Sequence, residues 1–208
     1  MKNSTRILLF LFLVNVLFWP VSAQNNPAKV KISANLDQLL TESQIYIREG
    51  LYERAQTNLL RILKLARTPQ ERMMAAFNLA EVEANLGNLS SAHDYYNQSL
   101  QLALEIGDKT LAGFCQKSVE IINLYNEAKK LRQENHPEEA IDVFNKTISY
   151  CDEVKNNILK CKALRQQSYA YLTLNKLNEF LKNNLKANEI AKKLNNVAEI
   201  VITFNNIG

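Results

Sequence analysis

The stretch AAFNLAEVEANLGNLSSAHDYYNQSLQLALEIGD, residues 75–108, decides the fold of this 208-residue chain. Apolar residues recur at helical spacing on both sides of Gly87, and no strand-like alternation persists. Because Gly tolerates a positive φ better than any other residue, one helix can end at Gly87 and a second can run back beside it. The stretch therefore predicts two antiparallel helices joined by a tight turn.

The same spacing recurs along the chain. In the stretch above, the small residue Ala80 precedes a second anchor, Ala92, by twelve positions, and Gly87 stands between them. The other anchors, each with its turn residue in the middle, are Ser43–Gly50–Ala55, Ala128–Asn135–Ala140 and Ser168–Asn175–Phe180. Small anchors let paired helices approach closely. Since one pair cannot bury its own apolar face, the pairs are expected to stack.

This register resembles the tetratricopeptide repeat (TPR), a pattern with a bulky residue at position 4, small residues at 8, 20 and 27, Gly at 15 and an aromatic residue at 24. Position 8 falls here on Ser43, Ala80, Ala128, Ser168 and Gly208, and position 4 on Leu39, Ala76, Leu124, Leu164 and Phe204. The departures are Phe180, Asn184 and Ile62. The resemblance implies an all-α fold, a right-handed superhelical array of stacked antiparallel helix hairpins.

The expected organisation is a signal peptide at 1–23, a flexible lead-in at 24–35 and a repeat array at 36–208. The units of the array are expected at 36–69, 73–106, 109–154, 157–194 and, truncated, 197–208. The second anchors Ala92 and Ala140 lie 48 residues apart. This distance predicts a first helix of the third unit, from about Lys109 to Glu134, that is two or three turns longer than its neighbours.

The sequence closes with TFNNIG, in which Phe204 and Gly208 take positions 4 and 8 of a fifth unit. We expect the chain to be a fragment of a longer protein; the alternative is that residues 196–208 form an abbreviated cap. A helix without its partner exposes an apolar face that would invite a homodimer.

The N-terminus carries the pattern of a secretory signal peptide. Lys2 and Arg6 precede the apolar run 7–18, and small residues allow cleavage between Ala23 and Gln24. The run is shorter than the roughly 20 residues of a spanning helix, although an uncleaved anchor is the alternative. Cleavage removes two of the four net positive charges, and the remaining charges are interspersed. The sequence therefore predicts an exported chain, periplasmic or extracytoplasmic, with no nucleic-acid partner.

Three cysteines, Cys115, Cys151 and Cys161, would meet an oxidising compartment after export. A disulfide between Cys151 and Cys161 across two helices is one possibility. Buried free thiols are the other, and they are favoured because packed helices usually hold Cα atoms too far apart for a disulfide.

Catalytic, cofactor-binding and metal-binding patterns are not found in the sequence. The histidines, His93 and His136, stand apart, no Cys or His pair has zinc spacing, and no Gly-rich phosphate loop follows a strand. We therefore predict that the chain is not an enzyme and binds no cofactor.

The resemblance implies instead a groove lined by the first helix of each unit, in which a protein or peptide ligand lies. The family's groove positions fall on Asn78, Glu81, Asn85, Tyr125, Asn126, Lys129, Arg132, Lys162, Arg165, Gln166 and Tyr169. Amides recur at position 6 as Asn78, Asn126, Gln166 and Asn206, where they can pair with a ligand backbone. The cations are suited to ligand carboxylates, and the tyrosines to apolar contact.

Two functions are consistent with these features. An export signal followed by TPR-like units resembles the extracytoplasmic sensory region of bacterial regulators, in which a membrane-spanning helix and a histidine kinase or helix-turn-helix domain follow. That resemblance implies signal transduction and membrane attachment through a C-terminal segment. The alternative is a stand-alone periplasmic scaffold that assembles other proteins.

Overall fold

The computed structural model describes residues 27–208, with side chains from Leu36 onward. The expected signal peptide and its cleavage point at Ala23 and Gln24 lie outside the described residues. Within 27–208 every regular element is an α-helix. The helices are α2 (Pro27–Arg48), α3 (Tyr52–Leu65), α4 (Pro69–Leu86), α5 (Leu89–Ile106), α6 (Lys109–Gln133), α7 (Pro137–Val154), α8 (Asn157–Thr173), α9 (Leu177–Lys193) and α10 (Val197–Ile207).

The chain divides into two compact units, Met1–Gln38 and Leu39–Gly208, and α2 crosses the boundary between them. In the first unit, the helical backbone of α2 begins at Pro27, inside the stretch expected to be a flexible lead-in. Pro is favourable at the first position of a helix, because the N–H that it lacks would have no helical partner there. The repeats belong to the second unit.

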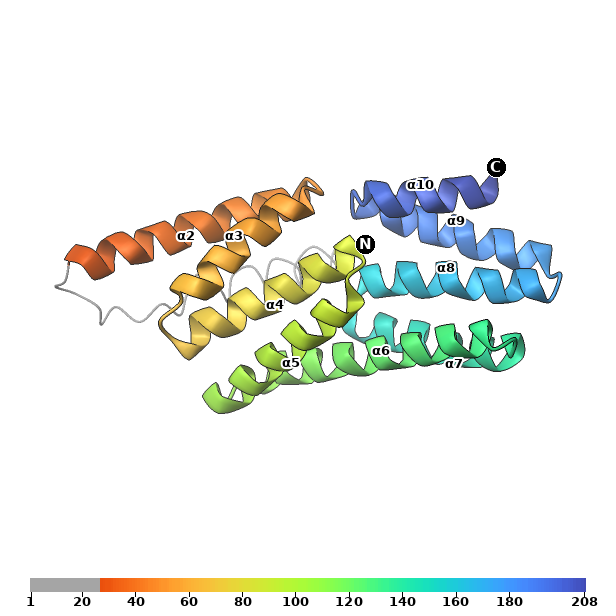
Figure 1. Cartoon of the computed structure of the whole chain (residues 1–208), viewed down its shortest axis with the longest axis horizontal. Helices are drawn as coiled ribbons and strands as arrows, with labels where there is room; N and C mark the ends of the chain where they lie inside the picture. The colour runs from red at the N-terminus through yellow and green to blue at the C-terminus, as the bar shows by residue number, and fades with distance from the viewer. Residues whose placement is uncertain (1–26) are drawn as a thin grey trace, which may run out of the picture. The chain divides into compact units, whose positions relative to one another are not determined.

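Within Leu39–Gly208, consecutive helices run antiparallel (Figure 1), and from α3 onward each packs against the next along the chain. Between α2 and α3, the Asn58 side-chain amide donates to the Glu42 carboxylate at 3.2 Å. The first helices of the repeats are α2, α4, α6, α8 and α10, and the second helices are α3, α5, α7 and α9. The all-helical, pairwise arrangement is a TPR-like α-solenoid, as the sequence predicts.

The turns within the repeats lie where the sequence places them. Gly50, Gly87, Asn135 and Asn175 all have positive φ, between 56° and 92°. Three further residues with positive φ, Gly107, Lys155 and Asn195, end the second helices. They lie in the gaps between the expected units, although the sequence analysis did not single them out as turn residues. Lys155 has no sequence signal, since Lys seldom adopts this conformation.

Helix α6 has 25 residues, whereas α4 has 18 and α8 has 17. The excess of seven or eight residues is about two helical turns. The long step between the anchors Ala92 and Ala140 is therefore taken up by a longer first helix, as expected.

The anchors form the helix crossings. Seven of the eight are fully buried: Ser43, Ala55, Ala80, Ala92, Ala128, Ala140 and Ser168. Next to them Leu59, Tyr96 and Phe144 are also fully buried. Burying a side chain of this size stabilises a fold by about 1.5–3 kcal/mol. The eighth anchor, Phe180, is half-buried, and its ring centroid lies 6.5 Å from that of Tyr169.

The turn after α2 meets the turn before α10. The Tyr52 hydroxyl donates to the carbonyl oxygen of Leu194 at 2.9 Å, and the Asn195 side-chain amide donates to the carbonyl oxygen of Arg48 at 3.0 Å. A Cβ at Gly50 would lie 2.4 Å from the carbonyl oxygen of Asn195. This approach requires Gly for space as well as for its φ of 74°.

We predict that Gly50→Ala destabilises the chain more than Gly107→Ala. Gly107 is the matched control, because its φ is 80° but nothing lies within 4 Å of its position for a Cβ. Both changes carry the cost of a side chain at positive φ, about 1 kcal/mol or more, and only Gly50→Ala adds a clash. Urea unfolding should give a free energy of unfolding that is lower for Gly50→Ala than for Gly107→Ala by at least about 1 kcal/mol. Equal losses would contradict the close contact with Asn195.

Candidate protein-interaction surface

All eleven predicted groove residues lie on the first helices α4, α6 and α8. Residues three or four apart share a side of a helix, so the predicted sets on each helix do face a common direction. Their surroundings nevertheless differ from helix to helix, and only some of them reach solvent.

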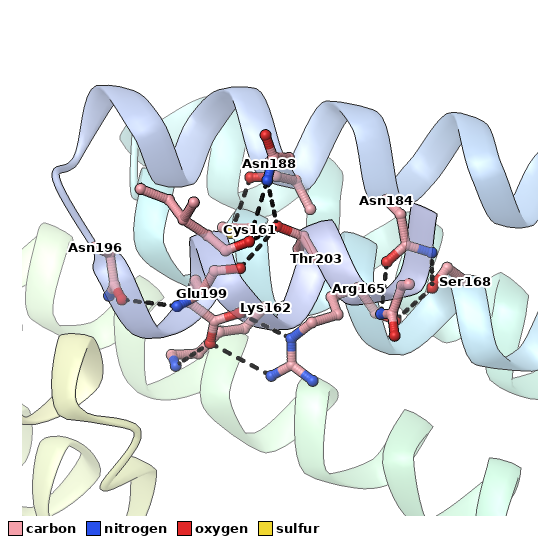
Figure 2. Close-up of polar contacts among 12 residues, drawn as sticks. Cys161, Lys162, Arg165, Ser168, Asn184, Asn188, Asn196, Glu199 and Thr203 are labelled. Atoms are coloured by element: carbon pink, nitrogen blue, oxygen red, sulfur yellow. Dashed lines mark hydrogen bonds and ion pairs between the residues drawn. The ribbon is translucent and has the colours of Figure 1, made fainter. Parts of the chain in front are cut away.

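On α8, Lys162 and Arg165 are paired with Glu199 of α10, as Figure 2 shows. Lys162 Nζ lies 2.7 Å from one carboxylate oxygen and Arg165 Nε lies 2.8 Å from the other. The Glu199 side chain is only 4% exposed. Burial alone would raise the pKa of this carboxyl, but the two cations outweigh it and hold the pKa below its ordinary value. Lys162 and Arg165, which were predicted to bind a ligand, are therefore paired with a carboxylate of the chain itself.

The start of α10 positions Glu199 for this role. The Asn196 side-chain oxygen accepts the backbone N–H of Glu199 at 3.0 Å, which caps the helix. The same side chain donates to the backbone carbonyl of Asn85 at 3.2 Å, so α10 is also bound to the end of α4. The pattern Asn-x-x-Glu at 196–199 is a helix-start signal that could have revealed the cap. The ion pairs of Glu199 have no such signal.

On α4, Glu81 accepts a short hydrogen bond from the Tyr96 hydroxyl, which in turn accepts from the Asn156 amide at 3.3 Å. Burial raises the pKa of the Glu81 carboxyl, although the hydrogen bond from Tyr96 acts in the opposite direction. Asn78 donates to the carbonyl oxygen of Met74. The predicted residues of α4 therefore take part in contacts between and within helices.

Between α6 and α8, five predicted residues remain grouped, and we call them the α6/α8 patch: Asn126, Lys129, Arg132, Gln166 and Tyr169. Asn126 and Lys129 are exposed. Arg132 donates from Nη2 to the Gln166 side-chain oxygen at 3.3 Å, and its guanidinium carbon lies 5.7 Å from the centre of the Tyr169 ring. Its buried Nε has no hydrogen-bond partner.

Tyr125, also predicted to contact a ligand, lies in the core. It is buried, and its ring packs edge-on against Phe144 at 6.2 Å. Burial raises the pKa of its hydroxyl to about 12. Among the position-6 amides, Asn206 is bound to Tyr169 and Asn184. Asn126 is the one member of that set that is exposed.

The three cysteines are free and buried, so Cys151 and Cys161 form no disulfide. Burial raises the pKa of the thiol to about 11 in Cys115 and to about 12 in Cys151 and Cys161. A thiol with such a pKa is almost wholly un-ionised at neutral pH and reacts slowly.

In the part of the chain that the structure describes, His, Cys, Asp and Glu do not gather in any group of three or more that could hold a metal ion. The same residues contain no helix of the length and apolarity needed to cross a membrane.

The helix pairs, their anchors and the stacked first helices define a TPR-like repeat protein. No family model matches the chain. Photosystem I assembly protein Ycf3 from Rippkaea orientalis is 27% identical over 121 residues, which cover 55% of this chain and 66% of that protein. The match thus spans just under two thirds of that relative. The crystal structure of BtubC from P. vanneervenii aligns with 86% of this chain and 72% of its own, at 14% identity and a TM-score of 0.38.

We predict that Glu199→Gln lowers the free energy of unfolding at neutral pH by about 3–5 kcal/mol, because it leaves Lys162 and Arg165 buried without their anion. The pKa of Glu199 is lowered in the folded chain, so its contribution is present above the ordinary carboxyl value of about 4.3 and is lost as pH falls below it.

Urea titrations at several pH values should therefore show that the difference in free energy of unfolding between the wild type and Glu199→Gln becomes smaller in acid. The exposed acid Glu189 on α9 provides the control, since Glu189→Gln should change stability little at any pH. A gap that is constant from neutral pH to pH ~3 would contradict the ion-pair assignment.

Proposed function

We propose that this chain is a non-catalytic protein-interaction module that helps to assemble other proteins, and that the α6/α8 patch contacts an acidic segment of a partner. The observation that carries the proposal is the guanidinium of Arg132, which lies on a partly exposed side chain and donates from Nη2 to Gln166 at 3.3 Å. A guanidinium can bind a carboxylate through two parallel hydrogen bonds, so its remaining donors suit an acidic ligand.

The surroundings of Arg132 suit a carboxylate. Lys129 lies one turn earlier on α6 and is exposed, so it adds a second positive charge on the same side. Gln166 takes only one of the guanidinium's donor groups, at 3.3 Å. Tyr169 supplies an aromatic surface beside it, and the exposed amide of Asn126 can pair with a ligand backbone.

An assembly role is further supported by the similarity to a protein named for assembling photosystem I. The similarity concerns the type of task, which is holding proteins together, and it names no partner of this chain. A TPR-like α-solenoid suits this task because it presents an extended surface built from successive helices.

We predict that Lys129→Ala with Arg132→Ala weakens binding of acidic peptides by about tenfold or more, since each loses a charge-assisted contact. Peptides of about 12 residues would be selected by display against the wild-type chain, and the tightest would be measured by fluorescence anisotropy. Lys130→Ala is the matched control, because Lys130 is an exposed neighbour on α6 that pairs with Glu134 at 3.8 Å. Equal binding by the double variant would move the contact surface elsewhere.

The proposal places this module outside the cytoplasm, on the basis of the signal-peptide pattern at 1–23. That pattern also favours the second candidate function, the sensory region of a membrane-bound regulator. In that case partner binding would bias a downstream kinase or DNA-binding domain. Sequencing the source gene past codon 208 separates the two roles, because a spanning segment of about 20 apolar residues is required only by the regulator.

Export is tested by fusing residues 1–35 to alkaline phosphatase, an enzyme that folds only after its disulfides form in an oxidising compartment. We expect activity from the fusion, and N-terminal sequencing should give Gln24 as the first residue. Replacing Val14 and Leu17 with Arg interrupts the apolar run and should abolish the activity. An inactive wild-type fusion would contradict export, and an active but uncleaved fusion would indicate an anchor.

A further inference from the structure

A pocket lies between the second helices α7 and α9 of two neighbouring repeats, and α8 contributes to its wall. Its volume is about 260 Å³. Leu164 and Gln167 of α8 are buried, whereas Asn145 of α7 and Lys186 of α9 are exposed, so the α8 side chains form the inner wall and the others form the rim. Both repeats that build the pocket have their two helices, so the pocket belongs to the interior of the array.

A row of hydrogen-bonded amides crosses the middle of the pocket. The Gln167 amide nitrogen donates to the side-chain oxygen of Asn145 at 2.7 Å, and the Asn183 amide nitrogen donates to the side-chain oxygen of Gln167 at 2.8 Å. Within the described residues, the amide nitrogen of Asn145 and the side-chain oxygen of Asn183 have no further hydrogen-bond partner. One donor and one acceptor are therefore left, and this is the pair that a peptide backbone requires.

The pocket has an acidic end, formed by Tyr171 and Glu179. Tyr171 lies four residues after Gln167 on α8, and Glu179 lies four residues before Asn183 on the antiparallel α9, so the hydrogen bond between the two amides places them opposite each other. Burial, and then the negative charges of Glu179 and of Asp142 on α7, raise the pKa of the Tyr171 hydroxyl. A carboxylate beside a neutral phenol suits a ligand cation.

The other end of the pocket is basic. Lys182 and Lys186 are one turn apart on α9, both are exposed, and neither forms an ion pair with any residue that the structure describes. Lys186 lies seven residues beyond Glu179, which is about 10 Å along a helix. An extended peptide of three residues has about the same length.

We propose that this pocket binds a short extended segment of a partner protein, about three residues long, with a basic side chain at one end and an acidic side chain at the other. The basic side chain pairs with Glu179, the acidic side chain pairs with Lys186, and the backbone between them meets the amides of Asn145 and Asn183. The volume of about 260 Å³ suits a segment of this size rather than a folded domain.

This site goes beyond the proposed function, because it is separate from the α6/α8 patch. Helix α8 takes part in both, with Gln166 bound to Arg132 of α6 and Gln167 bound to α7 and α9. A chain with two separate binding surfaces can hold two protein segments at the same time. The pocket would thus give an assembly module its second point of attachment.

NMR titration of the isotope-labelled full chain tests the site with three capped tripeptides: Lys-Ala-Glu, Lys-Ala-Lys and Glu-Ala-Glu. Lys-Ala-Glu should bind with a Kd below about 1 mM and should shift the side-chain amide signals of Asn145 and Asn183. It should also bind at least about fivefold more tightly than either like-charged peptide, because only the mixed peptide matches both ends of the pocket.

Reversing one charge of the pocket gives the second readout. Lys186→Glu should weaken Lys-Ala-Glu about tenfold and should make Lys-Ala-Lys the tighter ligand of the two. Lys192→Glu is the matched control, because Lys192 is exposed on α9 outside the pocket and its change alters the net charge equally. Thermal unfolding of both variants should match the wild type, since both lysines are exposed.

Four results would overturn the proposal: no shift of the amide signals at about 5 mM peptide, equal affinity for the three peptides, equal binding by Lys186→Glu and Lys192→Glu, or loss of Lys-Ala-Glu binding in the Lys129→Ala, Arg132→Ala double variant. The last result would place the peptide at the α6/α8 patch. Binding of Lys-Ala-Glu by that double variant as by the wild type would show that the pocket acts independently, whatever the outcome for the patch.

Discussion

Close contact between paired helices is the constraint on which this structure depends. At each crossing the two backbones approach over residues such as Ala80 and Ala92, which are fully buried. Larger side chains there would push the helices apart and lift the aromatic layer beside them, where Tyr96 and Phe144 fill the space without residual exposure. Because every pair is joined to the next by the same kind of contact, the geometry of one crossing is transmitted along the repeats.

Several residues at the predicted ligand-binding positions of the first helices instead hold neighbouring helices of the chain together. Lys162 and Arg165 occupy positions at which the family contacts ligands, yet both neutralise Glu199 of the next first helix. The amide of Asn206 is similarly taken up by Tyr169 and Asn184. The group that we propose to bind a partner is centred on Arg132, which hydrogen-bonds Gln166 where α6 and α8 meet.

Much of the fold was predictable from the sequence, because small anchors and turn residues recur at fixed spacing. The residue types of Gly50 and Asn135 predict their turns, and the long distance in sequence between the anchors Ala92 and Ala140 predicts the length of α6. The break between the units ending at 154 and beginning at 157 was predicted, but the left-handed conformation of Lys155 was not, because Lys seldom adopts it. The site was predictable only in part: the register names Lys162 as readily as Lys129, whereas the difference between them depends on Glu199, 37 residues further along the chain.

The contact between Gly50 and Asn195 bears on how this protein can evolve. Repeat arrays commonly change length by gaining or losing whole units, since each unit touches only its neighbours. Here the first turn and the last inter-repeat turn hold each other through Tyr52, Asn195 and the backbone of Arg48. Adding or removing a unit between them would separate these groups and leave their hydrogen bonds unmade. The number of repeats between these two turns is therefore constrained by this contact, and changes in length are expected outside the segment that the two turns enclose.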